Sequence, residues 1–180
     1  MGAFWNQAAS EPKRNYRWRL TIDGFGGTNK VVWWAKTVSL PSFDVSEVEH
    51  NYFDNKFYFP GRVSWSEVEA TLVDPVSPDA VNLTLAILTA SGYNIKESEA
   101  DQKTISKAAS TTNGLGAVMI EVFDAAGATA VEKWVLKNAF VKAAKFGDLD
   151  YSNDELKTIS ITLRYDWATC ETSIGTKFEP

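Results

Sequence analysis

Apolar and polar residues alternate most regularly near the end of the chain, between Leu156 and Trp167. Such alternation is typical of a β-strand, because successive side chains point to opposite faces. We therefore predict one long strand, which at about 3.3 Å per residue spans roughly 35 Å. The apolar positions are Ile159, Ile161, Leu163, Tyr165 and Trp167, and the polar ones are Thr158, Ser160, Thr162, Arg164 and Asp166. A second sheet, a helix or another subunit is needed to bury the apolar face.

Shorter alternating segments predict further strands at residues 17–22, 30–39, 63–74, 118–122 and 131–141. The first two flank the glycine-rich turn 23–29, so we expect them to pair as a hairpin. The apolar face of the third shifts between Trp65 and Val68, which indicates a bulge. Asn138 interrupts the last segment.

Residues 44–62 predict another pair of strands. Bulky apolar side chains flank a polar middle section, with a turn near Asp54, and Pro60-Gly61 lies close to the end of the segment. We expect a long hairpin that protrudes from the domain.

Residues 75–92 predict one helix. Ser77 is the expected N-cap, Pro78 the first helical residue and Gly92 the C-terminal stop. The expected apolar stripe consists of Val81, Leu85 and Leu88, widened by Ile87. The polar segment 95–116 predicts a surface excursion with a short helix around 99–109.

These elements, about eight strands and one helix without internal repeats, predict a mainly β protein, a β-sandwich or barrel-like domain with an attached helix. The length of 180 residues fits one domain. We divide it into an N-terminal arm (1–15), the β-domain (16–168) and a C-terminal tail (169–180). Phe4 and Trp5 are large apolar groups in the arm, so either they pack back on the domain or they dock on a neighbour.

The net charge of −5 argues against a general nucleic-acid binder, which needs a basic surface. A single cysteine, Cys170, allows no internal disulfide and favours a reducing compartment. No apolar run approaches the length of a membrane-spanning helix, so we expect no membrane-spanning segment.

Residues that carry enzyme chemistry are scarce. The one histidine, His50, is far from Cys170 in the sequence, and neither lies in a nucleophile motif. Ligands for soft metals are lacking, and the spacing of the acidic cluster does not match a calcium loop. We therefore expect no enzymatic activity, no cofactor and no metal site. The acidic cluster consists of Asp148, Asp150, Asp154 and Glu155.

A basic cluster precedes and enters the first strand, at Lys13, Arg14, Arg17 and Arg19. One interpretation is a solvated strand edge, where positive charge discourages aggregation. The other is that this cluster meets the acidic cluster of a neighbouring copy. Head-to-tail contacts of this kind close into rings or stack into filaments.

Several segments in order along about residues 14–168 carry a family resemblance. They are Arg17-Trp18-Arg19-Leu20-Thr21-Ile22, Leu40-Pro41, Asn55-Lys56-Phe57-Tyr58-Phe59-Pro60-Gly61, Trp65 with Val68-Glu69-Ala70-Thr71-Leu72, Ser91-Gly92-Tyr93, Trp134-Val135-Leu136-Lys137-Asn138-Ala139-Phe140 and Arg164-Tyr165-Asp166-Trp167. Together they resemble the tail tube proteins of contractile-tailed bacteriophages.

The resemblance implies a β-sandwich subunit without catalytic residues. Its hexameric rings would stack into a hollow tube inside a contractile sheath, with baseplate and tail terminator proteins as further partners. It would belong to the virion tail, assembled in the host cytoplasm, and DNA would pass through the lumen without specific binding.

Candidate contacts between subunits and rings under this resemblance are Arg17, Arg19, His50, Asn51, Tyr52, Phe53, Asp54, Asn55, Lys56, Asp148, Asp150, Asp154 and Glu155. The hairpin is the first candidate for ring-to-ring contact and the arm the second. The candidate lumen face consists of Thr158, Ser160, Thr162 and Arg164.

Two other functions fit the pattern. One is the inner tube of a phage-derived contractile injection or secretion system. The other is a monomeric carbohydrate-binding β-sandwich that stacks sugars on Trp33, Trp34 or Trp65.

Overall fold

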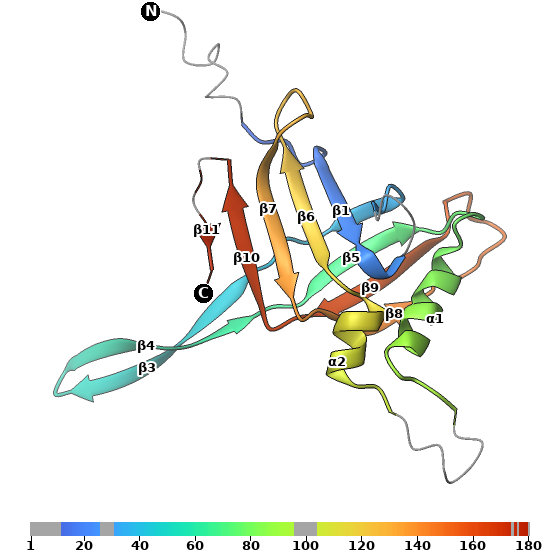
Figure 1. The fold of residues 1–180 in the computed structure, drawn as a ribbon. Coiled ribbons are helices and arrows are strands. Elements are labelled where there is room, and N and C mark those ends of the chain that lie inside the picture. The colour runs from blue at the N-terminus through green and yellow to red at the C-terminus, as the bar shows by residue number, and fades with distance from the viewer. Residues whose placement is uncertain (1–11, 26–30, 96–103, 174, 176, 180) are drawn as a thin grey trace, which may run out of the picture.

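The computed structural model of the chain describes residues 12–25, 31–95, 104–173, 175 and 177–179. Two antiparallel sheets cross over one core (Figure 1). The five-stranded sheet has the order β1 (Trp18–Ile22), β6 (Val118–Phe123), β7 (Ala130–Lys137), β10 (Trp167–Thr172) and β11 (Lys177–Phe178). The four-stranded sheet has the order β2 (Ala35–Val38), β5 (Val68–Val73), β9 (Thr158–Arg164) and β8 (Phe140–Lys145). The mainly β sandwich predicted from the sequence is confirmed.

Alternation along the strands builds the core, as the sequence predicts. In β9 the side chains of Ile159, Ile161 and Leu163 are buried, and the residues between them are not. In β1, Leu20 and Ile22 face them from the other sheet within the same core cluster. Apolar area removed from water on these two inner faces, at roughly 25 cal/mol per Å², is the main driving force for the fold.

The prediction of one long strand from Leu156 to Trp167 is wrong. β9 ends at Arg164, and β10 begins at Trp167 in the other sheet. The parity of burial changes at this corner: Tyr165 is still buried, but Trp167 is 37% exposed and Ala168 is fully buried. Residues 169–172, which the sequence places in the tail, continue β10 beside β7. The chain turns here because both halves must cover the same core from opposite sides.

The expected hairpin between the first two strands is also wrong. β1 pairs with β6 and β2 with β5. Among the described residues, an isolated bridge joins Thr21 to Val31, beside a hydrogen bond from the Val32 N–H to the Leu20 carbonyl oxygen. The bulge expected between Trp65 and Val68 is a change of sheet, since β4 (Asn55–Trp65) belongs to the projecting hairpin and β5 to the sandwich.

The predicted helix exists as α1 (Ala80–Ala90), but its start and its buried face differ from the prediction. Asp79, not Ser77, is the N-cap, because its side chain accepts a hydrogen bond from the backbone N–H of Asn82. The buried residues are Ala80, Thr84 and Ile87, whereas Leu85 is 46% exposed.

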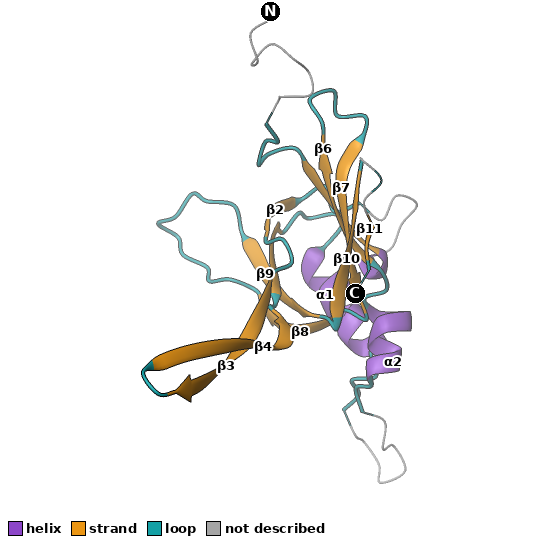
Figure 2. Cartoon of the chain, turned by 90° about the vertical axis from the view of Figure 1, so that its left-hand side faces the viewer, coloured by secondary structure: helices purple, strands orange, loops and turns teal. Residues whose placement is uncertain are grey.

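A second short helix, α2 (Lys107–Ala109), continues into one π-helical turn (Ser110–Gly114) that packs on α1. Both helices lie at one end of the sandwich (Figure 2). The short helix expected around 99–109 therefore begins at Lys107, and residues 96–103 lie outside the described part. None of the described helices has the length and apolarity needed to cross a membrane.

Candidate assembly interface

The most exposed secondary structure of the described chain is the hairpin of β3 (Phe43–Tyr52) and β4 (Asn55–Trp65). It forms a two-stranded sheet of its own and projects from the sandwich, as predicted for residues 44–62 (Figure 1). Every residue of both strands except Trp65 is exposed. A two-stranded hairpin alone is marginally stable in water, so one of this length gains from a partner surface.

Cross-strand register separates the outer hairpin into two faces. One face is mainly apolar; its members are Val48, His50, Tyr52, Asn55, Phe57 and Phe59. The opposite face is mainly polar; its members are Glu47, Glu49, Asn51, Lys56, Tyr58 and Pro60. On the polar face, the Lys56 ammonium lies 3.0 Å from a carboxylate oxygen of Glu49. The first set, called here the apolar hairpin face, is the surface most suited to contact with another protein.

The hairpin tip presents an aromatic pair. The two turn residues are Phe53 and Asp54, close to the predicted position. Phe53 has a φ of 52°, which is uncommon for a bulky residue, and its side chain is 87% exposed. Its ring meets that of Tyr52 edge to face at 4.6 Å. Strained backbone of this kind is concentrated at functional sites.

A bulge in β4, where Gly61 and Arg62 together face Ser46, sets the direction of the hairpin. The register shifts between Val45 and Glu47, opposite Gly61 and Arg62. The backbone N–H of Arg62 donates to the Ser46 hydroxyl at 2.8 Å. A Cβ on Gly61 would lie 2.3 Å from that hydroxyl oxygen and 2.9 Å from the Ser46 carbonyl oxygen. Only glycine fits there without displacing Ser46, because any Cβ would collide with it. The bulge bends and twists the strand that carries it.

Aromatic contacts fix the hairpin base to the sandwich. The Trp65 ring lies 5.5 Å from Phe43, 6.0 Å from Tyr165 and 6.4 Å from Phe178. Trp65 therefore anchors the hairpin and is not free to stack a sugar. Trp34, the second candidate for sugar stacking, is 5% exposed in the core, whereas Trp33 is 71% exposed. The three tryptophans form no common platform.

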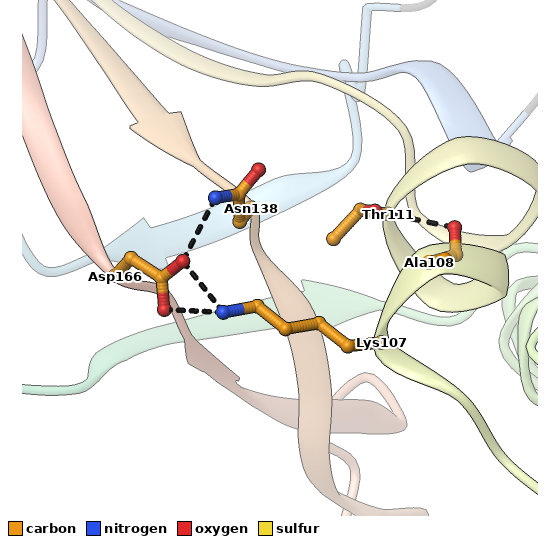
Figure 3. Close-up of polar contacts among 5 residues, drawn as sticks. All are labelled: Lys107, Ala108, Thr111, Asn138 and Asp166. Atoms are coloured by element: carbon orange, nitrogen blue, oxygen red, sulfur yellow. Dashed lines mark hydrogen bonds and ion pairs between the residues drawn. The ribbon is translucent and has the colours of Figure 1, made fainter.

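A polar clamp joins the corners where the chain changes sheet (Figure 3). The Asp166 carboxylate accepts hydrogen bonds from Lys107 Nζ at 2.6 and 2.7 Å and from Asn138 Nδ2 at 2.8 Å. Asn138 lies between β7 and β8 with a φ of 55°, and Asp166 lies between β9 and β10. The hydrogen bonds from Lys107 and Asn138 lower the pKa of Asp166. Sequence reasoning missed this clamp, because no local signal connects Lys107 with residues so distant in the sequence.

The predicted basic cluster already has partners within its own chain. Arg19 lies opposite Glu121 in the register, and its guanidinium contacts that carboxylate at 2.7 and 2.9 Å. Lys13 forms an ion pair with Glu132, and Arg17 lies over the ring of Tyr16. The cluster is therefore partly neutralised, which weakens its attraction for the acidic cluster of another copy.

The acidic cluster lies in the exposed connection between β8 and β9. Asp148, Asp150, Asp154 and Glu155 are all exposed. Hydrogen bonds from the backbone and side chain of Ser152 lower the pKa of Asp150. Within the described ranges, no three His, Cys, Asp or Glu side chains gather as a metal site would require. A contact between this loop and the basic cluster of a neighbour stays a prediction.

The outer face of the four-stranded sheet carries the hydroxyl row predicted in β9. Thr158, Ser160, Thr162 and Arg164 lie opposite the buried side of that strand. Ser160 is in register with Thr71 on β5 and Lys145 on β8, and Thr71 with Thr37 on β2. The row thus crosses the whole sheet. Its outermost members are the small Thr37 and the flexible Lys145.

No protein-family model matches the chain, and no curated protein matches it. Solved structures of similar fold include parts of contractile injection systems and a type six secretion system protein. A chain of the anti-feeding prophage cap, which terminates the tube, is 19% identical with a TM-score of 0.63, covering 91% of this chain and 93% of that one.

A chain of the PVC sheath–tube complex, from an extracellular contractile injection system in its extended state, is 17% identical with a TM-score of 0.62. The alignment covers 92% of this chain and 95% of that one. A crystal structure of an Hcp protein is 13% identical with a TM-score of 0.51, covering 89% and 96%. The fold of this chain is therefore that of the tube and terminator proteins of contractile machines.

Proposed function

We propose that the chain is a structural tube protein whose hexameric rings stack into the hollow inner tube of a contractile machine. The observation that carries the proposal is the projecting hairpin, whose apolar face is uncovered in the single subunit. The shared fold supports it. Contact of the hairpin with the next ring would bury this face and would repeat along the tube, as head-to-tail contacts do.

Two machines fit this proposal. The sequence resemblance favours a bacteriophage tail tube in the virion, with sheath, baseplate and tail terminator proteins as partners and DNA as the cargo. The solved structures of similar fold favour the second candidate, the inner tube of an injection or secretion system. In both machines the protein is structural and needs no catalytic residue.

We assign the lumen to the hydroxyl row of the four-stranded sheet, with Thr158, Ser160, Thr162 and Arg164 as its β9 members. The hydroxyl groups of Thr158, Ser160 and Thr162 offer a passing polymer few strong contacts. The Arg164 guanidinium lies 3.7 Å from the Glu67 carboxylate, which offsets its charge. The net charge of −5 would also repel the phosphates of DNA and keep them from binding. A conduit needs both properties, because cargo that bound tightly would stop.

Negative-stain electron microscopy and light scattering of the purified protein test the proposal. A hexamer of the 19.9 kDa chain has a mass of about 119 kDa. We expect rings at low concentration and hollow tubes at high concentration. A monomer at every concentration, including in the presence of preformed tube ends, would contradict the tube proposal and favour the carbohydrate-binding alternative.

A shortened hairpin separates the ring from the stack. Replacing residues 49–58 with Asn-Gly closes the strands after the Val48–Phe59 pair with a favoured two-residue turn. We expect this variant to form rings but no tubes, because the sandwich is intact and the hairpin tip is lost. Tubes of normal length from this variant would exclude the hairpin from ring-to-ring contact.

A further inference from the structure

An apolar cleft of about 400 Å³ opens between the start of β1 and the end of β2. Its floor and walls are apolar: Trp18, Val38, Leu40, Ile120 and Val122. The rest of the lining consists of Lys13, Arg14, Asn15 and Glu132. The cleft lies outside the hairpin and outside the hydroxyl row of the four-stranded sheet.

This cleft opens into the protein core. Ile120 is fully buried and belongs to the core cluster, and Trp18 and Val38 pack against that cluster. Leu40 at the rim is 45% exposed. Filling an apolar cavity in this position would stabilise the folded protein, because the lining side chains otherwise lack the contacts that close packing supplies.

The chain itself enters at the mouth of this cleft. Lys13 lines the cleft and forms an ion pair with Glu132 on β7, which fixes the point where the arm meets the domain. Residues 1–11 precede this point, and the two aromatic residues among them are Phe4 and Trp5. Trp5 lies seven positions before Pro12, a reach of up to roughly 25 Å for extended chain.

We infer that Phe4 and Trp5 of the arm insert into this cleft of their own subunit. The short tether holds the aromatic side chains of Phe4 and Trp5 near the mouth of the cleft at a high effective concentration. This favours the subunit's own cleft over that of another copy. Large aromatic side chains would supply the apolar contacts that the lining of the cleft otherwise lacks. The arm then fills the cleft of its own subunit and makes no contact with the next ring. This inference does not depend on the tube function.

Cross-linking tests the occupant directly. The variant carries Trp5→Cys and Leu40→Cys in a Cys170→Ser background and is treated with a short bismaleimide. The matched control replaces Leu40→Cys with Leu85→Cys, which lies on α1 with nearly the same exposure, 46% against 45%. We expect the 5–40 pair to give a monomer-sized product in which both thiols are consumed, at least tenfold faster than the control pair.

Two results would overturn the inference. Equal rates for the two pairs would show that the arm has no preference for the cleft. A selective 5–40 product that migrates as a dimer or larger species would show that the occupant is the arm of a second copy.

A second measurement leaves the cleft unaltered. Trp5→Ser should lower the Tm of the monomeric protein, whereas Asn6→Ser on the same arm should leave it unchanged. Equal Tm values for both variants and the wild type would contradict the inference, even if the cysteine variants fail to fold.

Discussion

Replacing Phe57 with alanine tests the apolar hairpin face. Phe57 is 49% exposed in the subunit. A phenylalanine buries roughly 150–250 Å² when enclosed, so contact with the next ring would remove about 75–120 Å² of this side chain from water. At about 25 cal/mol per Å², the Phe57 side chain contributes about 2–3 kcal/mol to each contact between rings.

The assay is sedimentation of assembled tubes, with the unassembled concentration measured in the supernatant. A loss of about 2 kcal/mol weakens each contact roughly 30-fold. Because the contact repeats around the ring, Phe57→Ala should leave rings unstacked at concentrations where the wild type forms tubes. The Tm of the subunit should stay that of the wild type, since the Phe57 side chain does not belong to the core cluster.

Tyr58→Ala is the matched control. Tyr58 is the next residue, it is 56% exposed, and cross-strand register places it on the opposite, polar face. We expect a much smaller effect on the unassembled concentration. The reasoning about the two faces would be refuted if Tyr58→Ala blocked stacking as strongly as Phe57→Ala, or if Phe57→Ala had no effect.

Three further predictions concern the fold that supports this surface. Leu163→Ala should lower the free energy of unfolding, measured in urea, by about 2–5 kcal/mol, because Leu163 is fully buried. Thr162→Ala on the other face of β9 is the control, and a similar loss of stability there would contradict the two faces of the strand. Gly61→Ala should reduce stacking without lowering the Tm, because the new Cβ would collide with Ser46, which lies within the hairpin and outside the core. Unchanged assembly of this variant would show that the bulge tolerates a Cβ at position 61. Asp166→Asn should lower the Tm modestly at pH 7, in line with about 0–1 kcal/mol for an exposed ion pair. The pKa of Asp166 is lowered in the folded state, so its contribution is present above the ordinary carboxyl pKa near 3.8 and is lost as the pH falls through the folded value. The Tm difference between Asp166→Asn and the wild type should therefore vanish in acid, and a constant difference from pH 7 to pH 2 would exclude this electrostatic origin.

Sequence reasoning succeeded where the signal is local. The alternation of Ile159, Ile161 and Leu163 identifies a half-buried strand, because one face of a sheet always follows a period of two. The hairpin could be predicted for the same reason, from two apolar segments around a polar turn. The mainly β fold follows from these elements together.

The same reasoning failed where two distant segments decide the outcome. Tyr165 and Trp167 have the same parity, and nothing in their spacing indicates that the chain changes sheet between them. Asp79 caps α1 although Ser77 has an equally suitable side chain, because the turn before the helix places the Asp79 carboxylate at the free N–H groups. The sequence shows the charges of Arg19 but not its pairing with Glu121 across the sheet.

By itself, then, the sequence determined where most strands of the sandwich lie, the buried face of β9 and the existence of the hairpin. These depend on side chains within a few residues of each other, whose alternation is fixed by backbone geometry. Only the tertiary structure decided the strand order, the corner at Asp166, the clamp with Lys107 and the separation of the hairpin into an apolar and a polar face. Each of these depends on contacts between residues distant in the chain, or on a register that a one-residue slip would reverse.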